Sequence, residues 1–172
     1  MNDLLKQLSS YHLFNFILPG AAFSILGNYL FAYNLVVENL FAALFFYYFV
    51  GLTISRIGSI VLEPAFKRLR IIEFGSYNDF IDASKKDEKI DTIFEMNNVY
   101  RTMVALPLCL LIYHAGLQIA EAINLAGWVR ATILLVTIFP LYILAWRKQT
   151  NYVYKRVSIA TNDEVDTGGE AQ

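Results

Sequence analysis

Long apolar runs alternate with polar segments along this chain. Two runs precede a polar middle and two follow it, at approximately residues 13–33, 40–62, 103–119 and 131–146. The first run is long enough to cross the roughly 30 Å hydrocarbon core of a bilayer. We therefore predict an all-α, polytopic membrane protein with four transmembrane helices.

The polar middle, residues 63–102, is strongly charged but nearly balanced in sign. Within it, the segment that continues from the second span is predicted to end at Gly75, and Ser76 and Asp79 form a capping-box-like start of the next helix. From Asp87 onward apolar side chains recur at helical spacing, and no helix breaker follows until Pro107. We therefore predict a cytosolic helical insert between spans two and three, ending in one long helix that runs into the third span.

These boundaries divide the chain into four parts. Residues 1–62 hold an amino-terminal amphipathic helix and the first transmembrane hairpin, and residues 63–102 form the insert. Residues 103–157 form the second transmembrane hairpin with a cytosolic helical extension, and residues 158–172 form a disordered tail. Because only residues 34–39 connect the first two spans, we expect the second span to return antiparallel to the first.

Small residues interrupt the first two spans. In the second span Gly51, Ser55 and Ser59 recur every four residues, a spacing that favours close helix contact in lipid. In the first span Gly20 and Ser24 begin a similar small and polar strip. Both spans are therefore expected to pack closely on other helices.

Composition and charge agree with a membrane location and predict an orientation. The chain is 56% apolar and 15% aromatic, which would leave too much apolar surface in water for a soluble protein. Of its 14 Lys and Arg residues, all except Arg56 and Arg130 lie on the side that holds the termini and the insert. The positive-inside rule therefore predicts that both termini and the insert face the cytosol.

Three ionisable residues in or beside the spans are candidates for a pore or gate: Arg56, Glu63 and His114. A charge within a span costs a few kcal/mol unless it reaches headgroups, water or an acid, on the order of 3 kcal/mol by insertion scales. Arg56 either lines a water-filled path or serves as an anchor that snorkels to headgroups or pairs with Glu63. His114 is either a titrating sensor or a neutral histidine hydrogen-bonded between helices.

Basic residues follow the second and the fourth span and are the candidate ligand-binding residues: Lys67, Arg68, Arg70, Arg147, Lys148, Lys155 and Arg156. Membrane topology and anionic headgroups account for such clusters in one interpretation. In the other, an oligomer gathers the clusters into a ring that binds a nucleotide or a short nucleic-acid strand.

Signatures of catalysis are mostly lacking in the sequence. It has no H-E-x-x-H, G-x-S-x-G, P-loop or G-x-G-x-x-G pattern and no paired His/Cys metal spacing. The single cysteine, Cys109, lies in an apolar run and excludes an internal disulfide. We predict a protein that is not an enzyme and that has no metal or cofactor.

The four-span pattern, with FNFILPG early, GLTISRIGSIVLEP in the second span and NNVYRT at the end of the insert, resembles the small bacterial membrane effectors of anti-phage defence. It is most similar to the Hailong type, in which a nucleotidyltransferase partner makes a DNA product that restrains the membrane protein. The resemblance implies a homo-oligomer in the bacterial inner membrane that opens a gated pore, with a nucleotide or single-stranded DNA as ligand. The alternative is a non-catalytic membrane anchor or assembly subunit that recruits a cytosolic partner.

Overall fold

The structure is a computed structural model that describes residues 11–87 and 89–168. All its regular secondary structure is helical, and there is no strand among the described residues. The all-α class is therefore confirmed. The elements are α2 (Tyr11–Phe31), α3 (Leu40–Ile57), the π-helix η1 (Gly58–Leu62), α4 (Glu63–Arg68), α5 (Tyr77–Lys86), α6 (Lys89–Ala122) and α7 (Gly127–Gly168).

Three stretches of helix are long and apolar enough to cross a membrane. They are Leu40–Arg68, Lys89–Ala122 and Gly127–Ile159, and they contain the second, third and fourth predicted spans. The first predicted span also lies in a helix, α2, and the part of it whose side chains the structure describes, Asn15–Phe31, is a shorter apolar stretch. The chain is thus a helical protein with three candidate transmembrane helices, and a fourth span stays a prediction.

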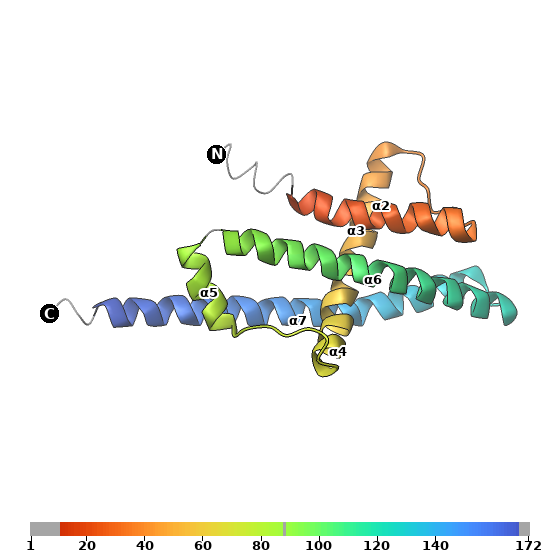
Figure 1. The fold of residues 1–172 in the computed structure, drawn as a ribbon. Helices are drawn as coiled ribbons and strands as arrows, with labels where there is room; N and C mark the ends of the chain where they lie inside the picture. Colours follow the sequence, from red (N-terminus) through yellow and green to blue (C-terminus); the bar gives the residue numbers. More distant parts are fainter. Residues whose placement is uncertain (1–10, 88, 169–172) are drawn as a thin grey trace.

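Helix α3 and its continuation through η1 and α4 cross the other long helices (Figure 1). In that view α2, α6 and α7 extend lengthwise, while α3 runs steeply across them and contacts all three. The expectation that the second span returns antiparallel to the first is therefore wrong. The reason lies in how α2 and α3 touch.

The contact between α2 and α3 is a crossing of two backbones at paired glycines. A Cβ atom added to Gly20 would lie 1.8 Å from the carbonyl oxygen of Tyr47, and one added to Gly51 would lie 1.8 Å from that of Phe16. Because neither backbone can move aside without shifting its helix, only glycine fits at both positions. The small residues do bring the helices together, as expected, but at one crossing point rather than along a hairpin.

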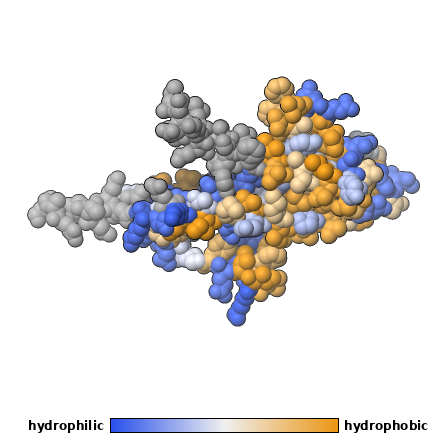
Figure 2. Space-filling view, turned by 45° about the horizontal axis from the view of Figure 1, so that its top comes forward, coloured by the Kyte–Doolittle hydropathy of each residue, from blue (hydrophilic) through white to orange (hydrophobic). Residues whose placement is uncertain are grey.

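The core lies where α2, α3, η1 and α6 meet. Its buried side chains are Phe23, Ile54, Leu62, Ala105, Leu106, Cys109 and Leu110. Helix α7 stays largely outside it, since only 6% of its apolar window is buried against the rest of the chain. Figure 2 shows that hydrophobic residues cover much of the middle of the molecule, with hydrophilic residues gathered towards its ends.

The polar insert folds back through α5. Helix α5 begins at the predicted cap, where the Ser76 hydroxyl accepts a hydrogen bond from the Asp79 N–H at 3.1 Å. Its Ile81 is buried, and its Phe80 ring packs against Phe94 of α6 with the ring centroids 4.8 Å apart. The preceding helix ends at Arg68, before the predicted stop at Gly75.

The long helix predicted to join the insert to the third span is present. Helix α6 runs unbroken from the insert through Pro107 to Ala122. Helix α7 is also continuous, and it includes residues 158–168, which we predicted to belong to a disordered tail. The remainder of the tail, residues 169–172, and most of the amino-terminal amphipathic helix lie outside the described residues.

Candidate functional site

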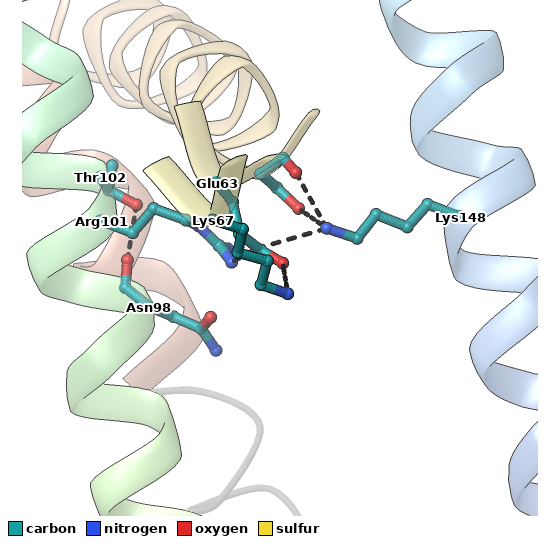
Figure 3. Close-up of polar contacts among 7 residues, drawn as sticks. Glu63, Lys67, Asn98, Arg101, Thr102 and Lys148 are labelled. Carbon is teal, nitrogen blue, oxygen red and sulfur yellow. Dashed lines mark hydrogen bonds and ion pairs between the residues drawn. The ribbon is translucent and has the colours of Figure 1, made fainter. Parts of the chain in front are cut away.

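Three boundaries between apolar and polar sequence meet at one point in the structure. Glu63 follows the apolar part of α3 and η1, Arg101 precedes the apolar part of α6, and Lys148 follows that of α7. The crossing of α3 over α6 and α7 brings these three side chains together, and Figure 3 shows them converging from separate helices. We call Ser59, Glu63, Lys67, Arg101 and Lys148 the junction.

Glu63 is the centre of the junction, and its side chain is only 8% exposed. Its Oε1 accepts a hydrogen bond from Lys67 Nζ at 3.0 Å. Its Oε2 accepts from Arg101 Nη1 at 2.8 Å and from Lys148 Nζ at 3.3 Å. One carboxylate thus connects α4, α6 and α7 through three ion pairs.

A second acceptor in the junction comes from the π-helix. The Glu63 N–H donates to the Gly58 carbonyl, five residues back, and Pro64 has no N–H to offer the next carbonyl. The Ser59 carbonyl therefore lacks its usual helical donor. Lys148 Nζ donates to this carbonyl at 2.9 Å and to Ser59 Oγ at 2.8 Å.

The junction carries more positive than negative charge. Lys67, Arg101 and Lys148 share the single carboxylate of Glu63, so the cluster keeps two unbalanced positive charges. It is also short of acceptors, since Arg101 Nε is buried and has no hydrogen-bond partner among the described residues. A cluster with spare donors and spare positive charge attracts an anion.

A cleft of about 480 Å³ opens beside the junction between η1, α4 and α7. Its apolar lining is Ile60, Pro64 and Leu144, and its polar lining adds Arg147, Asn151 and Tyr152 to the junction residues Ser59, Glu63, Lys67 and Lys148. Arg147 makes no ion pair with any described acidic residue, so its guanidinium is available to a ligand. The cleft therefore combines apolar and cationic side chains in one lining.

The structure brings together three of the seven predicted ligand-binding residues. Lys67, Arg147 and Lys148 line the cleft. The others lie outside that lining and are exposed: Arg68, Arg70, Lys155 and Arg156. Sequence reasoning did not single out Arg101 or Ser59. For Ser59 the sequence did contain a signal, because Pro64 has no N–H to donate to the Ser59 carbonyl.

The predicted gate residues lie at separate places. Glu63 is in the junction, whereas Arg56 lies seven residues before it, about two helical turns. Arg56 is half-buried, with no acidic group of the described residues within ion-pair distance. The suggested pair between Arg56 and Glu63 is thus not formed, because Glu63 is occupied by Lys67, Arg101 and Lys148.

His114 lies between helices and is hydrogen-bonded there, as one of its two interpretations expected. Its Nδ1 forms a hydrogen bond with the Tyr33 hydroxyl, and its ring stacks on Phe31 with the centroids 4.1 Å apart. These contacts join α6 to the end of α2 and the connection that follows it. His114 lies thirteen positions beyond Arg101 on α6, about 20 Å along the axis at a rise near 1.5 Å per residue.

Comparison with known proteins gives this chain no relative: no protein-family model matches it, and neither a curated protein nor a solved structure does. The junction and the helices that form it are therefore the basis of the proposed function.

Proposed function

We propose that the chain is a membrane effector of bacterial anti-phage defence that assembles as a homo-oligomer and forms a gated pore. The junction carries this proposal, because Glu63 connects the crossing helix to α6 and α7 where their apolar parts end. A change in those ion pairs alters how three candidate membrane helices are held together. In the proposal the inner membrane holds the protein, with both termini in the cytosol.

The surface of α7 supports assembly with further copies. Its exposed large side chains include Leu135, Val136, Phe139, Ile143 and Trp146. Within one chain α7 touches mainly α3 and η1, so most of this apolar surface must be covered by lipid or by neighbouring subunits. An oligomer supplies the additional helices that an aqueous path requires.

The charge of the junction supports control by an anionic ligand. Three cations around one carboxylate repel one another, and a bound anion at the basic positions reduces that repulsion and holds α4, α6 and α7 together. Loss of the anion weakens the contact among α4, α6 and α7 at the junction and lets these helices repack. In this proposal a nucleotidyltransferase-type partner and its nucleotide or single-stranded DNA product act as regulators, and Arg56, Glu63 and His114 act at the gate.

Membrane potential measured with a voltage-sensitive dye tests the pore. Glu63→Gln removes the shared carboxylate, so we expect it to dissipate the potential at lower expression than the natural chain does. Glu73→Gln is the matched control, because Glu73 is exposed and lies outside the junction. An unchanged potential for the natural chain and for Glu63→Gln, at equal membrane abundance, would refute the pore.

A non-catalytic membrane anchor is the second candidate, and the cytosolic extension of α7 favours it. Beyond Trp146 this helix continues to Gly168 and exposes Val153, Tyr154 and Val157, which suits the docking of a partner. The mass of the purified protein in detergent separates the candidates. A monomer that captures a cytosolic partner supports the anchor, and a homo-oligomer with conductance supports the pore.

A further inference from the structure

We infer that the cleft beside the junction binds the phosphate group of an anionic phospholipid. This inference rests on the membrane location in the proposed function, but it requires neither conduction nor the cytosolic regulators. Three observations carry it: the charge of the cleft, its place along the helices and the composition of its walls.

The first observation is charge. Lys67, Arg147 and Lys148 line the cleft with Glu63 as the one carboxylate among the lining residues, so the lining keeps two positive charges. The three N–H groups of Lys148 already point at Ser59 and Glu63, but the Arg147 guanidinium makes no ion pair with the described acidic residues. A guanidinium with free N–H groups binds a phosphate through two parallel hydrogen bonds.

The second observation is position. The cleft lies where the apolar parts of η1 and α7 give way to polar residues, and in the proposed membrane location this boundary is the level of the lipid headgroups. Trp146, beside Arg147 in the chain, is 75% exposed, and Tyr152 belongs to the lining. Tryptophan and tyrosine concentrate at this level of a bilayer because their rings have both an apolar body and a polar group.

The third observation is the composition of the walls. Ile60 and Pro64 on η1 and α4, and Leu144 on α7, form the apolar part of the lining, beside the cationic side chains of the same helices. A free phosphate ion makes no use of these apolar side chains, whereas the glycerol backbone and first methylene groups of a lipid can pack on them. Basic pockets between membrane helices bind anionic headgroups in the same manner.

The test measures lipid binding to the full-length protein in a neutral detergent. We expect phosphatidylglycerol to bind saturably and to raise the thermal midpoint, while phosphatidylcholine, inorganic phosphate and glycerol phosphate bind far more weakly. Native mass spectrometry gives the number of lipids per chain, which we expect to be one at this site. Equal binding of glycerol phosphate and phosphatidylglycerol would overturn the assignment to a lipid, and no saturable binding would overturn the site.

Variants separate the cleft from general basic surface. Arg147→Gln removes the free guanidinium without touching the ion pairs of Glu63. We expect it to weaken phosphatidylglycerol binding about a hundredfold, because two charge-assisted hydrogen bonds are lost and each contributes roughly tenfold. Lys155→Gln, on the same helix but outside the lining, is the matched control and should bind as the natural chain does. Equal loss in both variants would show nonspecific attraction and overturn the proposal. Because lipid binding is measured without any conductance assay, this test remains valid even if the protein forms no pore.

Discussion

The crossing helix α3 is held at two contacts of opposite character. Past its middle Gly51 touches α2 at Gly20, with backbone against backbone and no charged group in the contact. Where its continuation α4 begins, Glu63 joins α6 through Arg101 and α7 through Lys148, and it also pairs with Lys67 of α4 itself. The first contact depends on shape and the second on charge.

This difference decides which contact can be regulated. A contact between two backbones has one geometry, because close-packed atoms leave no room for an alternative. Ion pairs with an excess of cations respond to any anion that enters, and to the removal of one partner. The crossing therefore fixes α3 on α2, and in the proposed function the junction is where a ligand changes the structure.

The largest effect is expected at the crossing. Gly20→Ala places a methyl group 1.8 Å from the Tyr47 carbonyl oxygen, so the helices must separate. We expect a loss of about 3 kcal/mol in the free energy of unfolding, the upper part of the usual range for overpacking. Reversible unfolding in mixed micelles, followed by circular dichroism, measures it.

Gly116→Ala is the control for that experiment. Nothing lies within 4 Å of a Cβ atom added at Gly116, so the substitution should leave stability unchanged or raise it by about 0.5 kcal/mol through helix propensity. Equal stability of Gly20→Ala and Gly116→Ala would show that the crossing is not formed.

A somewhat smaller effect is expected at the junction. Glu63→Gln leaves Lys67, Arg101 and Lys148 without their shared anion, and we expect a loss of about 2 kcal/mol. This loss of stability is smaller than that expected on breaking a fully buried ion pair, because the Lys67 side chain is 43% exposed and is solvated by water. The same unfolding assay measures it, with Glu73→Gln expected to stay within about 0.5 kcal/mol of the natural chain.

The hydroxyl of Ser59 should contribute less. Ser59→Ala removes the 2.8 Å hydrogen bond to Lys148 Nζ but keeps the one to the Ser59 carbonyl, so we expect a loss of about 1 kcal/mol. A double-mutant cycle with Lys148→Met isolates this contact. A coupling energy of zero between the two substitutions would contradict the geometry of the junction. Ser158→Ala, which loses only a bond within its own helix, is the control.

The smallest expected effect is that of salt on stability, and it should differ between the crossing and the junction. Sodium chloride screens both the attraction to Glu63 in the natural chain and the repulsion among cations in Glu63→Gln. The stability difference between those two proteins should therefore shrink by a few tenths of a kcal/mol between roughly 0.05 and 0.5 M salt. The difference caused by Gly20→Ala should not change, and parallel changes in both would remove the distinction.

Local features of the fold were predictable because they depend on neighbours in the chain. The cap at Ser76 and the unbroken helix α6 follow from side-chain pattern and from the lack of a breaker, and both are observed. The end of α4 at Arg68 was missed, because Arg70 takes a left-handed conformation, with φ at 56°, that no sequence signal indicated.

The candidate site was predictable only in part. Lys67, Arg147 and Lys148 were identified as basic residues beside the spans, yet their meeting depends on a helix crossing. Arg101 was one charge among many in the insert, and Ser59 was a packing residue. Their roles arise from the 2.8 Å contacts that they make with partners far away in the chain, Glu63 for Arg101 and Lys148 for Ser59.

The sequence by itself determined that the chain is helical and where apolar segments give way to polar ones, because helix formation and hydropathy are properties of consecutive residues. Only the tertiary structure decided that α3 crosses α2 instead of running back along it. The crossing depends on the close approach of Gly20 and Gly51, because without side chains at these positions the two backbones can touch. The short connection between the helices did not specify the angle at which they cross. The same crossing placed Glu63 between Arg101 and Lys148.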